Sequence, residues 1–71
     1  MRGDAMRAGE TELQMCIRHV AEQEARIARQ QALIGRLRKS RSPLFDDALR
    51  LLGEMHGFLD AMRNHVARLS N

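Results

Sequence analysis

The sequence predicts an all-α protein, a two-helix antiparallel hairpin that dimerises into a four-helix bundle. Apolar residues recur every seven positions in two long segments, and a Ser-Pro step separates these segments. The chain has 71 residues, and a chain of this size hides only about 60% of its unfolded surface when it folds alone. Cys16 is the only cysteine, so no disulfide within the chain can add stability. Self-association is the remaining common solution for so small a core.

Residues 1–10 carry two glycines and mixed charges, and we expect a flexible leader unless Met6 extends the first helix. That helix is predicted over residues 11–39. It begins at Thr11 because Thr11-Glu12-Leu13-Gln14 has the form of a capping box, in which the Thr hydroxyl and the Gln side chain satisfy free backbone amides. Its apolar stripe repeats every seven residues, at Leu13, Val20, Ile27 and Ile34.

Polar residues lie at the edge of this stripe. They are Glu24 and Gln31, or Gln23 and Gln30 if the helix is rotated slightly. Polar groups in a helix seam cost stability but fix the alignment of partner helices. We interpret them as alignment residues, and a polar binding pocket is the alternative.

A short turn is predicted over residues 40–42, followed by a second helix over 43–69. Ser42 suits the N-cap position and Pro43 suits the first helical turn, where the helix dipole also favours the acidic residues that follow. So short a connector makes the two helices antiparallel neighbours. The stripe of the second helix comprises Phe45, Ala48, Leu52, Met55, Leu59, Met62, Val66 and Leu69.

The second helix has a broader apolar face than the first, because Leu44, Leu51 and Phe58 widen its stripe on one side. One hairpin leaves this flank exposed, and contiguous exposed apolar surface usually marks an interface. We expect a homo-oligomer, with a dimer as first choice and another helical protein as a further possible partner. The predicted oligomer interface comprises Leu44, Leu51, Leu52, Met55, Phe58, Leu59, Met62 and Val66.

We expect no catalytic centre, no cofactor and no metal. Cys16 and His19 stand three residues apart on one helix, but a zinc site needs four ligands, or three and a water molecule. No Glu-x-x-His pair, the motif of carboxylate-bridged metal bundles, occurs in the chain. The three serines fall in the turn and the tail, and nothing in the sequence orients a histidine toward them.

The strongest charge feature lies at the hairpin tip, where four cations could contact an anion: Arg36, Arg38, Lys39 and Arg41. Cations at a helix C-terminus also simply complement the helix dipole. The net charge is only +3 and no Trp or Tyr is present to stack on bases. We therefore expect at most weak binding of nucleic acid or an anionic surface. No apolar run approaches the roughly 18 residues of a membrane span, and the unpaired cysteine favours a cytoplasmic location.

Residues 19–30, His-Val-Ala-Glu-Gln-Glu-Ala-Arg-Ile-Ala-Arg-Gln, resemble a group of small alphaproteobacterial helical-hairpin proteins to which no activity is assigned. In the second helix the spacing of Leu51, Leu52, Met55, Leu59 and His65 is similar to theirs. The chain departs from the group in its turn, which lacks glycine, and at His56-Gly57, where the group has an acidic pair. The resemblance implies a stand-alone helical protein.

Overall fold

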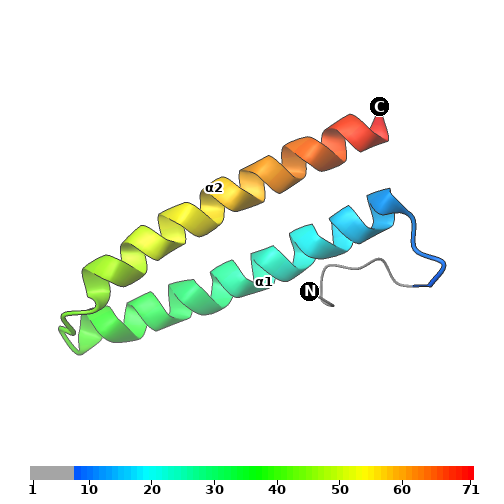
Figure 1. Ribbon diagram of the computed structural model, residues 1–71. Coiled ribbons are helices and arrows are strands. Elements are labelled where there is room, and N and C mark those ends of the chain that lie inside the picture. Colours follow the sequence, from blue (N-terminus) through cyan, green and yellow to red (C-terminus); the bar gives the residue numbers. More distant parts are fainter. Residues whose placement is uncertain (1–7) are drawn as a thin grey trace.

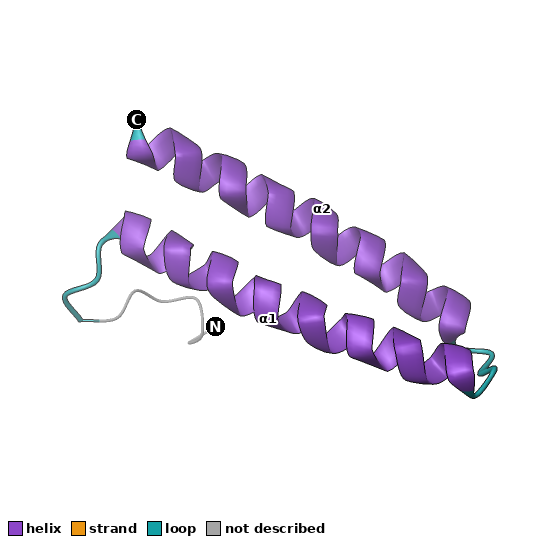
Figure 2. Ribbon diagram, turned by 180° about the vertical axis from the view of Figure 1, so that it is seen from behind, coloured by secondary structure: helices purple, strands orange, loops and turns teal. Residues whose placement is uncertain are grey.

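The computed structural model describes residues 8–71, and it is an antiparallel pair of long helices. Helix α1 comprises Glu12–Lys39 and helix α2 comprises Phe45–Ser70. The two run beside each other along their whole length and are joined by one tight turn (Figures 1 and 2). No strand occurs among the described residues. The predicted all-α helical hairpin is confirmed.

Helix α1 begins with the predicted capping box. The hydroxyl of Thr11 accepts a hydrogen bond from the amide of Gln14 at 3.0 Å. In return the amide of Thr11 donates to the side-chain oxygen of Gln14 at 2.9 Å. Two amides that the first helical turn leaves without an intrahelical acceptor are thereby satisfied.

Upstream of the cap, Glu10 is tied to the body of α1. Its carboxylate accepts hydrogen bonds from Nε and Nη2 of Arg18 at 2.9 and 3.0 Å, and Glu22 accepts a third from Nη1 at 3.4 Å. Hydrogen bonding to Glu10 raises the pKa of Arg18, because it favours the charged guanidinium. The rest of the predicted leader, residues 1–7 with Met6, lies outside the described residues.

Helix α1 ends at Lys39 in a Schellman turn. The amide of Ser42 donates to the carbonyl of Leu37 at 2.9 Å, and the amide of Arg41 donates to the carbonyl of Arg38 at 3.2 Å. This pattern requires a left-handed residue after the C-cap, a position that glycine usually fills. Here Arg41 adopts it, with φ at 54°.

Helix α2 begins two residues later than the predicted Pro43. The N-cap of the observed helix is Leu44 and not the predicted Ser42, and no side chain caps it. The hydroxyl of Ser42 accepts a local hydrogen bond from the amide of Leu44 at 3.1 Å. Its carbonyl, however, accepts from the amide of Phe45 at 3.2 Å, three residues on. That spacing gives a tighter turn than an α-helix, so the regular helix starts only at Phe45.

The seam between the helices is thin, and its most buried residues are Cys16, Gln23, Ile27, Ala48 and Leu59. The α2 stripe lies against α1 as its spacing predicts. Of the two alternatives for the polar positions in α1, the structure has the rotated one. The side-chain amide of Gln23 donates to the carbonyl of Met55 at 3.2 Å, and that of Gln30 donates to the carbonyl of Ala48 at 3.0 Å. Glu24 and Gln31 are exposed instead.

Candidate functional site

Three large apolar residues, one at the N-cap of α2 and two within the helix, remain exposed in one row beside the seam. The exposed fractions are 59% for Leu44, 46% for Leu51 and 59% for Phe58. They stand seven residues apart, so they follow one line along the helix, and His65 continues that line. The fold of a single hairpin gives no reason for an exposed apolar row of this kind.

Helix α1 extends this apolar surface at the tip end. Leu33, itself 36% exposed, lines a shallow groove together with Leu37, Leu44 and Leu51. We call Leu33, Leu44, Leu51 and Phe58 the apolar side of the hairpin. Leu33 was absent from the predicted interface. Its signal in the sequence is that it directly precedes a stripe residue, Ile34, just as Leu44 directly precedes Phe45 and Leu51 directly precedes Leu52.

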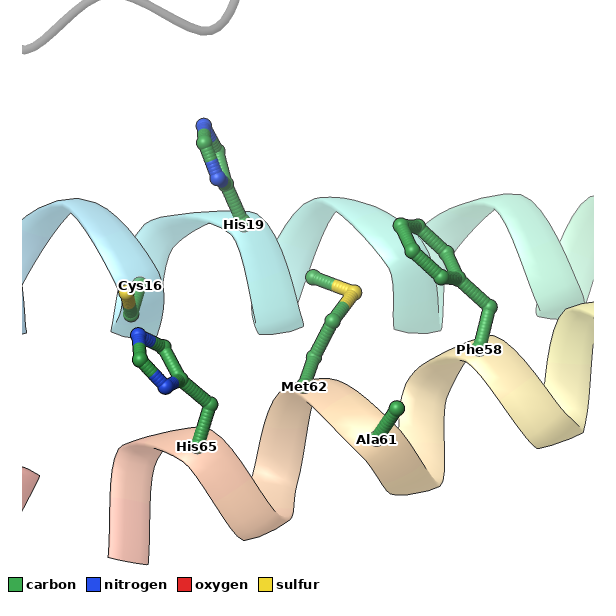
Figure 3. Close-up of a pocket in the computed structure, with 6 residues that line it drawn as sticks. All are labelled: Cys16, His19, Phe58, Ala61, Met62 and His65. Atoms are coloured by element: carbon green, nitrogen blue, oxygen red, sulfur yellow. The ribbon is translucent and has the colours of Figure 1, made fainter. Parts of the chain in front are cut away.

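A second groove, of about 270 Å³, lies on the apolar side toward the open end, where α1 begins and α2 ends. Its lining combines apolar side chains with a thiol and two imidazoles: Cys16, His19, Phe58, Ala61, Met62 and His65. Figure 3 shows Phe58 and Met62 reaching from α2 toward α1, with His65 near Cys16. The ring of His19 points away from α2. Its Nε2 atom is buried without a hydrogen-bond partner among residues 8–71.

The opposite side of the hairpin is polar. The guanidinium of Arg63 donates to the carboxylate of Glu24 across the two helices at 2.6 Å. Ile17, exposed to 51%, lines a shallow groove there with Val20, Arg63 and Val66, and Leu49 is exposed to 43% nearer the tip. Scattered apolar residues of this kind are normal on a protein surface.

The structure divides the eight predicted interface residues into two groups. Leu44, Leu51 and Phe58 are exposed and available to a partner. The other five face α1 within the same chain and form the hairpin seam, and Leu59 is only 4% exposed. These five seam residues are Leu52, Met55, Leu59, Met62 and Val66.

The four predicted anion contacts, Arg36, Arg38, Lys39 and Arg41, are all exposed around the tip. Within residues 8–71 none of them forms an ion pair. Arg38 and Arg41 border a shallow hollow that also holds the acidic Asp46. The tip therefore presents positive charge without an enclosed binding site.

Among residues 8–71, no three His, Cys, Asp or Glu side chains come together in a way that could hold a metal ion. Neither α1 nor α2 is both long and apolar enough to cross a membrane.

No family model matches the chain, and neither curated proteins nor solved structures give a match. The likeness of residues 19–30 to the alphaproteobacterial hairpins stays a prediction.

Proposed function

We propose that the protein is a non-catalytic helical interaction module whose first partner is a second copy of itself. Two hairpins would pack through their apolar sides and form a four-helix bundle. The observation that carries this proposal is the row of Leu44, Leu51 and Phe58, exposed along one side of α2, while the row on the other side continues from Leu49 to His56 and Arg63. The resemblance to stand-alone hairpin proteins supports the same role, and the free thiol of Cys16 fits a module of the reducing cytoplasm.

The energetics favour association through this side. Removing apolar surface from water contributes roughly 25 cal/mol per Å², and the exposed row offers such surface from three large side chains. The seam of a single hairpin buries few residues, so we expect a low free energy of unfolding for the monomer. A partner that covers the apolar side enlarges the core without any change in the hairpin itself.

The matched pair of substitutions Leu51→Asp and Leu49→Asp tests the proposal. Both are leucines of α2, exposed to 46% and 43%, but they lie on opposite sides of the helix. Multi-angle light scattering at micromolar concentration should give a dimer for the wild type and for Leu49→Asp, and a helical 8.1 kDa monomer for Leu51→Asp. The charge placed on the apolar side would have to be buried without a partner.

Circular dichroism of both variants serves as the control for folding. A wild type that is a folded monomer at micromolar concentration would contradict the proposal. So would equal dissociation of the two variants, because the effect would then come from added charge and not from the side that carries it.

The exposed cations of the tip, which form no ion pair with other residues of 8–71, favour a second candidate function, weak binding of nucleic acid or another polyanion. A titration of fluorescent duplex and single-stranded oligonucleotides at about 0.15 M salt should then show sequence-blind binding at roughly 10⁻⁴ to 10⁻⁶ M. The opposite result would be nanomolar binding that discriminates sequence and is lost when Arg38, Lys39 and Arg41 are changed to Ser. It would reject the interaction module in favour of a nucleic-acid-binding regulator.

A further inference from the structure

The hairpin carries opposite charges at its two ends. The hydrogen bonds from Gln23 to Met55 and from Gln30 to Ala48 set the register of the helices, so residues 26–53 form the tip half. This half holds seven Arg and Lys residues against two Asp, a net charge of +5. The open half, residues 8–25 and 54–71, holds three Arg against six Asp and Glu, a net charge of −3.

We propose that two copies pair in antiparallel orientation through their apolar sides, so that the tip half of each lies against the open half of the other. The inference rests on the proposed self-association and adds its geometry. It identifies the occupant of each groove on the apolar side as a side chain of the second copy.

Charge complementarity selects this orientation. Helices that pack against each other lie about 8 to 10 Å apart, which is comparable to the Debye length of about 8 to 10 Å at ordinary ionic strength, so charges across the interface are only partly screened. A parallel pair would bring two halves of charge +5 together, and like charges across an interface are unfavourable. The antiparallel pair instead places each positive half beside a negative one.

The shape of the apolar side agrees with the same orientation. Leu44 projects at the tip end, and the groove lined by Phe58, Met62 and His65 lies toward the open end. In an antiparallel pair Leu44 of each copy faces that groove in the other, so a two-fold axis repeats one contact twice.

The second projecting residue fits in the same register. Phe58 lies fourteen residues after Leu44. The two grooves are spaced by the same fourteen residues along the chain. Leu44 and Leu51 line the tip-end groove, and Phe58 and His65, each fourteen residues later, line the open-end groove. When Leu44 sits in the open-end groove of the partner, Phe58 therefore sits in the partner's tip-end groove beside Leu33.

Double electron–electron resonance between two labelled copies tests the orientation. A nitroxide attached through a ketone-bearing amino acid at position 40, in the exposed turn, leaves Cys16 in place. The antiparallel register separates the two labelled positions by about 29 helical residues, or about 44 Å along the axis, and the spacing between helices brings the distance to about 45 Å. A parallel pair gives about 20 Å or less.

The salt dependence of the unlabelled wild type gives a second reading that needs no substitution. Raising the salt from about 0.05 M to about 0.5 M should weaken the antiparallel dimer several-fold, because attraction between its halves is screened. A parallel dimer should instead become tighter. A distance near 45 Å with weakening in salt supports the proposal. A stable dimer with a distance near 20 Å, or one tightened by salt, overturns the orientation but keeps the self-association. A folded monomer under all conditions overturns both.

Discussion

The two rows of α2 that flank the seam differ in chemistry although they occupy equivalent places. One row is Leu44, Leu51 and Phe58, and the other begins with Leu49 and continues through His56 to Arg63. At the end of the second row, Arg63 forms an exposed ion pair with Glu24 of α1. The first row consists of apolar side chains that form no ion pairs, and they stay largely exposed.

This difference separates the residues that the hairpin needs from those that it does not. A two-helix hairpin needs one inward stripe on each helix, and α2 provides it with residues such as Leu52 and Leu59. Apolar residues beyond that stripe add nothing to the fold of one chain when they remain in water. Their concentration on one side is therefore evidence about assembly and not about folding.

The largest expected effect compares the seam with the apolar row. Leu59→Asp places a charge at a position that is 4% exposed, and it should lower the free energy of unfolding by about 3 to 5 kcal/mol. Leu51→Asp, in the neighbouring row, should change the stability of the monomer by about 0.5 kcal/mol or less. Urea unfolding followed by circular dichroism, in dilute samples below the concentration of self-association, measures both.

If Leu59→Asp kept the helicity and melting temperature of the wild type, the core face would be misassigned. Equal losses in the two variants would show that the seam and the apolar row form one cooperative core even in the monomer.

Cys16→Ala should lower the free energy of unfolding by about 1 kcal/mol, because the buried thiol acts as a small apolar group. Cys16 lies in the seam and also lines the open-end groove, so this variant shows how far the two features depend on each other. Assembly should survive. Metal analysis of the purified protein is the check on chemistry, since stoichiometric zinc in the wild type that disappears in the variant would assign the thiol a ligand role.

Arg41→Gly should raise the free energy of unfolding by about 0.5 to 1 kcal/mol. The residue has φ at 54°, a conformation that costs an L-residue roughly 1 to 2 kcal/mol and glycine almost nothing. Thermal unfolding should shift to higher temperature, while the dimer should weaken only slightly through the loss of one of the seven cations of the tip half. Arg41→Ala, which removes the charge but keeps the Cβ atom, is the control, and equal stabilisation by both would point to charge repulsion at the tip.

Glu24→Gln should have the smallest effect. It removes one charge from a pair whose side chains are about half exposed, and such surface pairs contribute about 0.2 to 1 kcal/mol. The loss should shrink further in high salt, and the dimer should weaken only slightly because Glu24 lies on the polar side, away from the interface. A marked change in self-association measured by sedimentation would place the polar row in the interface and contradict the comparison of the two sides.

Much of the fold follows from local chemistry and was predictable. The capping box at Thr11 and the polar turn between the helices depend on neighbours within a few residues, and the α2 stripe depends on a seven-residue repeat. The exposure of Leu44, Leu51 and Phe58 was predictable too, because a single antiparallel neighbour covers only one stripe. The helix start at Pro43 was wrong by two residues, since the tight hydrogen bond at Ser42 is a matter of backbone geometry.

By itself, then, the sequence determined two amphipathic helices, their antiparallel pairing and the excess of apolar residues on one flank of the second. The tertiary structure alone decided the rotation of α1. Gln23 and Gln30 turn inward because carbonyls of α2 lie within reach of their amides, while Glu24 turns out to meet Arg63. The same rotation of α1 places Leu33 on the apolar side of the hairpin. With α1 in this rotation, the ring of His19 points away from α2. A heptad repeat defines a broad face of a helix, but the partner's atoms determine which residues at its edge are buried.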